Sequence, residues 1–263
     1  MRNNAFVICL TTLVVGIFGF FLRWLQTLNG FDENGLAIPG AATAIVFLVY
    51  SVLALGAFAL VLRFYLRGKR APTLASGAFR APNAIPGLVM WVLAVLMVIA
   101  CLVLMFSSDF ARYPTMQRLT SALGIFAGLC LPFIIKAKAE GENKAEDKGP
   151  AAIAALIPVL FCSLWLVTAY RVEAENPVLW SYVLEILGII AAAVSFYYIA
   201  AYFYGRANPA RCLFTLQLAV YLCLTTLMDE HAFAEKLLFG VLAAVFLVFE
   251  YLIFSNIGEA KEE

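Results

Sequence analysis

Three polar side chains lie inside long apolar stretches of this sequence, where they are costly to place. Glu185 and Glu250 interrupt two of these stretches, and Gln217 lies in a third. An ionisable residue inside a membrane segment is rare, and it marks a substrate path, a proton relay or a buried ion pair. Glu185, Gln217 and Glu250 are therefore the candidates for a substrate or proton path.

Both carboxylates also have a structural alternative. Arg23 and Arg118 lie near the ends of segments that approach Glu185 from the same side, and Arg63 lies near the end of segment 38–64 on the side of the membrane nearer to Glu250. A buried charge is tolerated when a charge of opposite sign pairs with it. Arg23, Arg63 and Arg118 are therefore candidates for structural ion pairs, and the sequence leaves both alternatives open.

Helical spacing predicts which way Glu185 points. Gly188 and Ala192 follow it at intervals of three and four residues, so the three residues share one helix face. Small residues mark the close-packing face of membrane helices. We therefore expect Glu185 to face protein. Gly124 and Gly128 form a second small-residue motif of the same kind.

Other catalytic or metal-binding patterns are missing from the sequence. The single His, His231, follows Asp229 and Glu230 in a predicted loop, where we expect it to be solvated. The six Cys form no C-x-x-C pair, so no ligand set for zinc or an iron–sulfur cluster is expected, and no cofactor is predicted. The sequence also lacks the G-x-S-x-G and H-E-x-x-H motifs and a Gly-rich phosphate loop, which argues against an enzyme.

The elements that must position these residues follow from composition. Of the 263 residues, 64% are hydrophobic and 13% are charged, against about 45–50% and about 25% in soluble domains. This excludes a soluble enzyme, a disordered chain and a nucleic-acid binder, and it predicts an all-α polytopic membrane protein in a lipid bilayer. About 20 apolar residues cross the bilayer core. Eight segments qualify: 5–25, 38–64, 87–106, 116–135, 151–170, 178–203, 212–228 and 236–254.

The basic residues predict the orientation of the eight segments. Of the 18 Lys and Arg, five fall on one side of the membrane and all the others on the side that holds both termini. Basic residues accumulate on the cytoplasmic side. We therefore expect both termini in the cytoplasm, and the short loops favour a bacterial plasma membrane. The five on the other side are Arg23, Arg112, Arg118, Arg171 and Lys236.

A charged segment at residues 136–150 divides the chain into four-helix halves, 1–135 and 151–263, within one membrane domain. An offset of 123 residues places Ala84 and Pro86 on Ala207 and Pro209, and further matches follow. This pattern favours a 4+4 parallel internal repeat. Segments 66–86 and 136–150 are either solvated loops or docking surfaces for a membrane or cytoplasmic protein partner.

These features favour a small-solute transporter or permease. The alternative is a non-transporting membrane subunit, sensor or scaffold, and an intramembrane enzyme ranks third. A polar cavity that gathers Glu185, Gln217 and Glu250 would favour transport, whereas a dry core would favour the scaffold.

Overall fold

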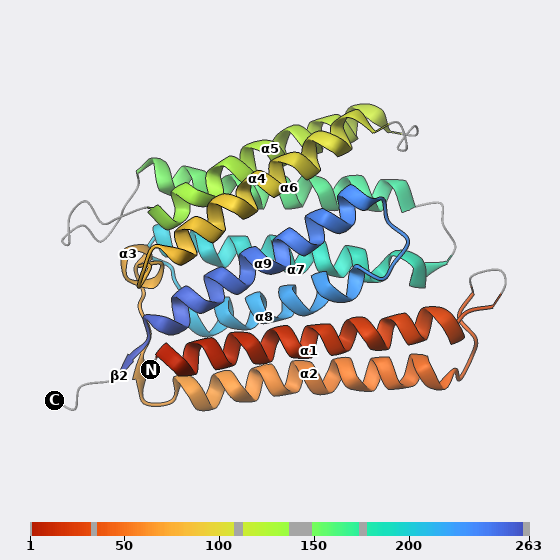
Figure 1. The fold of residues 1–263 in the computed structure, drawn as a ribbon, viewed down its shortest axis with the longest axis horizontal. Helices are drawn as coiled ribbons and strands as arrows, with labels where there is room; N and C mark the ends of the chain where they lie inside the picture. Colours follow the sequence, from red (N-terminus) through yellow and green to blue (C-terminus); the bar gives the residue numbers. More distant parts are fainter. Residues whose placement is uncertain (1, 33–35, 108–112, 137–148, 174–177, 260–263) are drawn as a thin grey trace.

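The computed structural model describes residues 2–32, 36–107, 113–136, 149–173 and 178–259. Within these ranges, eight helices are long and apolar enough to cross a membrane, which confirms the predicted number and the all-α class. They are α1 (Arg2–Asn29), α2 (Ala42–Leu66), α4 (Ile85–Phe106), α5 (Pro114–Lys136), α6 (Pro150–Glu173), α7 (Leu179–Phe203), α8 (Pro209–Thr226) and α9 (Phe233–Ser255) (Figure 1).

The connection between α2 and α4 is partly folded onto the bundle. It contains the short strand β1 (Lys69–Arg70) and the one-turn helix α3 (Ala75–Ala78), and β1 pairs antiparallel with β2 (Gly258–Glu259). Phe79 is 2% exposed and stacks on Phe203 with ring centroids 5.9 Å apart. Part of the predicted 66–86 loop is therefore packed against the protein, while most of 136–150 lies outside the described residues.

Six helices form a closed ring. Each of α4, α5, α6, α7, α8 and α9 packs against the next, and α9 packs back against α4. The α1–α2 hairpin lies outside this ring and packs on α8, with α1 also touching α9 (Figure 1). The ring brings together helices from both halves of the chain, so a site inside it draws on residues far apart in sequence.

The helix packing does not follow the division into halves. In the second half, the second and third spans (α7 and α8) form a packed pair, whereas their counterparts α2 and α4 are not a packed pair. The helix packing therefore gives the 4+4 duplication no support, and the duplication stays a prediction from sequence.

Glycines allow the closest helix approaches. A Cβ added at Gly124 of α5 would collide with Cys101 Sγ of α4 and lie 2.8 Å from Phe161 Cε2 of α6. A Cβ at Gly19 of α1 would lie 2.6 Å from Tyr221 Cε2 of α8. Membrane helices gain stability from such close packing, because lipid removes the hydrophobic drive between them.

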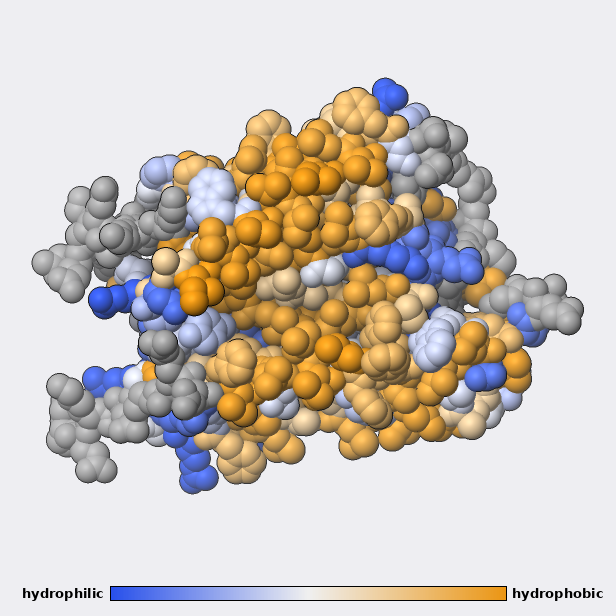
Figure 2. All heavy atoms as spheres, viewed as in Figure 1, coloured by the Kyte–Doolittle hydropathy of each residue, from blue (hydrophilic) through white to orange (hydrophobic). Residues whose placement is uncertain are grey.

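An apolar belt surrounds the middle of the bundle. Figure 2 shows hydrophobic residues across the centre of the visible face and hydrophilic residues gathered at its two ends. Large apolar side chains such as Leu53 and Val52 are more than half exposed on α2. This distribution indicates a lipid environment, and the chain is a multi-pass membrane protein.

Candidate functional site

The two ends of the bundle differ in the charged residues that they carry. We call the end where α1 begins and α9 ends the basic end; it holds Arg63, Arg67 and Arg211. The opposite end, which holds Asp229, Glu230 and Glu235, is the acidic end.

A cavity opens at the acidic end of the six-helix ring. Its volume is about 240 Å³, and it is lined from α5, α6, α7, α9 and the α8–α9 turn. Four of its lining residues are glutamates: Glu173, Glu185, Glu230 and Glu235. Among the described residues, no Lys or Arg lines it. We call this cavity the acidic pocket.

The tight turn between α8 and α9 builds one wall of the acidic pocket. Backbone hydrogen bonds from Asp229 N to Thr226 O (3.0 Å) and from His231 N to Asp229 O (3.0 Å) close the turn. Helix α9 begins two residues later, and Glu235 lies in its first turn. A carboxylate there interacts favourably with the positive end of the helix dipole.

His231 is the centre of this site, which corrects our expectation of a solvated loop residue. Its side chain is 8% exposed, and its Nδ1 lies 3.7 Å from Glu235 Oε2 and 4.0 Å from Glu185 Oε2. Its Nε2 is buried and has no hydrogen-bond partner among the described residues. Burial lowers the pKa of His231 to about 4, and the nearby Lys236 acts in the same direction. His231 is therefore neutral at pH 7.

Aromatic side chains form the floor of the acidic pocket. Trp165 of α6 lines the pocket, and its ring lies 4.8 Å from the ring of Phe239 on α9. The ring of Phe161 stacks on Trp165 with ring centroids 5.6 Å apart. The ring of helices is therefore filled with aromatic side chains directly beneath the carboxylates.

Glu185 faces protein, in agreement with its predicted helix face. The residue is 6% exposed, and Gly188 on the same face lies against α8 and α9. Among the described residues, however, Glu185 forms no ion pair with Arg23 or Arg118. Its neighbours are His231 and Glu235 instead.

Arg23 forms a buried ion pair with Asp229. Its Nη2 and Nε lie 2.7 Å and 2.8 Å from Asp229 Oδ1, and its Nη1 donates to Gln26 Oε1 at 3.0 Å. The two charged side chains are 2% and 3% exposed. Burial raises the pKa of Asp229 to about 6, with Arg23 opposing the shift, so the carboxylate is ionised at neutral pH. The pair fastens α1 to the α8–α9 turn.

Glu250 and Gln217 meet in a separate cluster at the junction of α1, α8 and α9. Glu250 Oε1 accepts hydrogen bonds of 2.9 Å from both Gln217 Nε2 and Thr12 Oγ1. Glu250 is 0% exposed and Gln217 is 1% exposed. Glu250 Oε2 and Gln217 Oε1 have no hydrogen-bond partner in the described part of the chain. No described ion pair joins Glu250 to Arg63.

The three candidate path residues therefore do not share one cavity. Glu235, at the acidic pocket, and Glu250 lie 15 residues apart on α9, which corresponds to about 22 Å along the helix. Glu185 belongs to the acidic pocket, whereas Gln217 and Glu250 form the buried cluster nearer the basic end.

Comparison with known proteins adds no assignment. No protein family, curated protein or solved structure matches this chain.

The acidic pocket has the chemistry of a cation site. Over the described residues, no group of three or more His, Cys, Asp or Glu side chains has the arrangement needed to hold a metal ion. Carboxylates beside an aromatic side chain can interact with an organic cation by charge pairing and by a cation–π contact, here with Trp165.

Sequence reasoning missed Asp229, Glu235 and Thr12. The first two lie at the ends of apolar stretches, where charges are normally solvated, and Thr12 is one of many hydroxyl residues in the chain. One signal was present: His231 and Glu235 are four residues apart, which places them on one face where a helix begins between them.

Proposed function

We propose that this protein is a membrane transporter for a small organic cation, such as a primary ammonium ion, and that the acidic pocket is where the cation binds. The observation that carries the proposal is the convergence of Glu185, Glu235 and neutral His231 on one cavity at the mouth of the helix ring. This arrangement offers negative charge and hydrogen-bond acceptors without a competing Lys or Arg on the described wall.

The size of the acidic pocket limits the solute. Pockets for drug-sized ligands span about 300–1,000 Å³, and this one is about 240 Å³. A cation of a few heavy atoms fits such a volume. An anion would meet the glutamates unfavourably, so the pocket selects against carboxylates and phosphates.

The Glu250–Gln217–Thr12 cluster supplies the second station of the proposed pathway. It contains a buried carboxyl group on α9, the helix that also carries Glu235. Buried carboxyl groups of this kind relay protons or ions in membrane transporters. In this proposal the Trp165–Phe239 contact, with ring centroids 4.8 Å apart, separates the two stations and must open for passage.

A second candidate function is a non-transporting receptor or membrane subunit that senses the cation. The Glu250 cluster favours it, because the buried hydrogen bonds from Thr12 and Gln217 to Glu250 also serve to hold α1, α8 and α9 together.

We also propose that the basic end faces the cytoplasm of a bacterial plasma membrane. The exposed arginines Arg67, Arg70, Arg80 and Arg206 at that end support this placement. The exposed part of segment 66–86, together with 136–150, would then be the surface available to a cytoplasmic protein partner.

Purified protein in liposomes tests the transport proposal. We expect uptake of radiolabelled methylammonium and no uptake of acetate. Glu235→Gln should abolish both uptake and equilibrium binding of methylammonium, because it removes charge from the pocket. Glu250→Gln should keep binding and lose uptake, because it alters only the second station.

Each other outcome has a defined meaning. Binding of methylammonium without uptake by the unaltered protein would replace the transporter by the receptor. Absence of both, in protein whose unfolding is cooperative, would refute the assignment of the acidic pocket to organic cations.

A further inference from the structure

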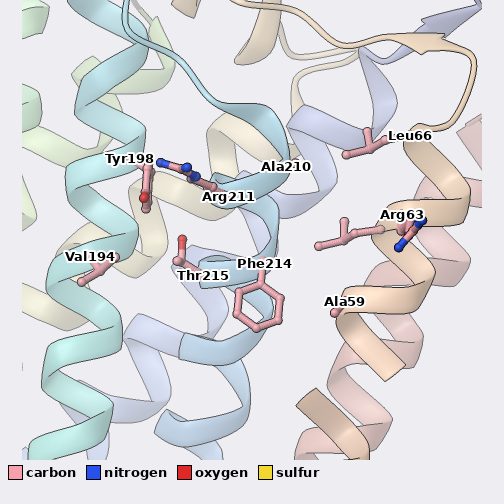
Figure 3. Close-up of a pocket in the computed structure, with 10 residues that line it drawn as sticks. Ala59, Arg63, Leu66, Val194, Tyr198, Ala210, Arg211, Phe214 and Thr215 are labelled. Carbon is pink, nitrogen blue, oxygen red and sulfur yellow. The ribbon is translucent and has the colours of Figure 1, made fainter. Parts of the chain in front are cut away.

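A second cavity lies on the membrane-facing side of the bundle, near the basic end. Its volume is about 570 Å³, and it lies between α2, α7 and α8. Most of its wall is apolar, with Leu62 from α2, Val194 from α7 and Phe214 from α8. We call it the basic groove, and Figure 3 shows its lining side chains around the space between these helices.

Two arginines flank the basic groove. Arg63 reaches it from the last turn of α2, and Arg211 from the first turn of α8. Both residues are exposed, and neither forms a side-chain ion pair with any carboxylate among the described residues. Tyr198 and Thr215 add hydroxyl groups to the same lining.

The local fold holds Arg211 at the level where membrane spans end. Gly205 adopts a φ of +66° after α7, a conformation that suits glycine, and it turns the chain toward α8. Asn208 then caps α8, because its side chain accepts a hydrogen bond of 3.1 Å from Arg211 N. The positive end of the α8 dipole therefore lies beside the arginine and favours an anion there.

Positive charge continues past the mouth of the basic groove. A neighbouring hollow of about 480 Å³ is lined by Arg63, Phe64, Leu66 and Arg67, so it shares Arg63 and Leu66 with the basic groove. A ligand whose anionic group lies near these arginines would therefore have space in this hollow as well as along the apolar wall of the basic groove.

We propose that the basic groove binds one anionic phospholipid, with an acyl chain along the apolar wall and the anionic headgroup at the basic end, where Arg63 and Arg211 flank the groove from its two sides (Figure 3). The occupant follows from charge complementarity and position. An apolar slot between lipid-exposed helices selects a hydrocarbon chain, and two guanidinium groups without an ion-pair partner among the described residues select an anionic headgroup. The proposal is independent of the solute that the acidic pocket binds.

Native mass spectrometry and thermal unfolding of the delipidated protein test this site. We expect phosphatidylglycerol to bind and to raise the midpoint of unfolding, and phosphatidylcholine to do so much less. In the double variant Arg63→Gln/Arg211→Gln, phosphatidylglycerol binding should weaken by roughly 30-fold, because each basic side chain near a membrane surface contributes about fivefold. Arg80→Gln removes a charge at the same end of the bundle outside the groove and should leave binding unchanged.

Filling the apolar wall separates a lipid from a free anion. Ala59 is exposed and lines the basic groove, so Ala59→Phe should block the acyl chain while both arginines remain. We expect it to weaken phosphatidylglycerol binding as the double variant does. Equal stabilisation by inorganic phosphate, or unchanged lipid binding in Ala59→Phe, would overturn the lipid assignment. Equal loss in Arg80→Gln would show that only general surface charge attracts the lipid.

Discussion

At the residue scale, the pair of Arg23 and Asp229 has the largest expected effect on stability. Both side chains are buried and share two short hydrogen bonds. Removing one partner leaves the other charge buried and uncompensated. We expect Arg23→Gln to lower the free energy of unfolding by about 3–5 kcal/mol.

Matched variants check this expectation. In chemical unfolding in detergent, the double variant Arg23→Gln/Asp229→Asn should lose less free energy of unfolding than the two single variants lose in sum. Arg171→Gln, at an exposed position of the same end, should change stability by about 0.5 kcal/mol or less. Additive effects of the single variants would contradict a direct coupling.

His231 gives the protein a specific pH dependence. In the folded state its pKa is lowered from 6.5 to about 4, so between these values the unfolded chain binds a proton that the folded chain does not. The His231 contribution to stability is therefore present above pH 6.5 and is lost as the pH falls toward 4. Asp229, whose pKa is raised from 3.8 to about 6, acts in the opposite direction between those two values.

A variant isolates the histidine contribution. The variant His231→Gln keeps the other charged groups near this position, which are Glu185 of α7, Glu235 and Lys236 of α9, and Asp229 and Glu230 of the turn. Between pH 6.5 and pH 5, the unaltered protein should lose about 1.6 kcal/mol more stability than the variant. Parallel stability curves for the two proteins would mean that His231 titrates normally.

At the element scale, glycine determines how closely helices approach. Gly124→Ala should cost about 1–3 kcal/mol of stability, because its Cβ meets Cys101 and Phe161 on two neighbouring helices. Gly56→Ala is the matched control within α2, since no atom lies within 4 Å of its added Cβ. There the substitution should be neutral or stabilising by about 0.4–1 kcal/mol. Thermal unfolding of both variants tests this. Equal shifts of the unfolding midpoint would mean that helix propensity alone, and not close packing at Gly124, determines the effect.

The position at which α9 begins explains why Glu235 was not predicted as a site residue. The sequence places the last span at 236–254, whereas α9 runs from Phe233 to Ser255. A hydropathy pattern places the end of a span near the adjacent charged residues Glu235 and Lys236, but Glu235 is favoured in the first helical turn by the backbone dipole. That shift brings Glu235 into α9, four residues after His231.

At the scale of the whole molecule, orientation in the membrane can be tested directly. We expect an impermeant maleimide to label Leu36→Cys, at the acidic end, in intact cells, and to label Arg67→Cys, at the basic end, only after permeabilisation. Both positions are exposed, whereas five of the six native Cys are buried and Cys130 is partly buried. Labelling of Arg67→Cys in intact cells would reverse the proposed orientation.

The sequence by itself determined the class of protein and the eight membrane spans. The physical reason is that a bilayer core of fixed thickness requires about 20 apolar residues per helix, whose backbone must satisfy its own hydrogen bonds. It also indicated that Glu185 faces protein, because Gly188 recurs at helical spacing on the same face. These properties are local, so they can be read along the chain.

Only the tertiary structure decided which polar groups meet. Arg23 pairs with Asp229, Glu185 approaches His231, and Glu250 joins Gln217 and Thr12. In a membrane helix the lipid-facing and buried faces are both apolar, so hydrophobic periodicity gives little information about neighbouring helices. The closure of α4 to α9 into a ring, with α1 and α2 outside it, supplies the contacts that sequence spacing does not encode.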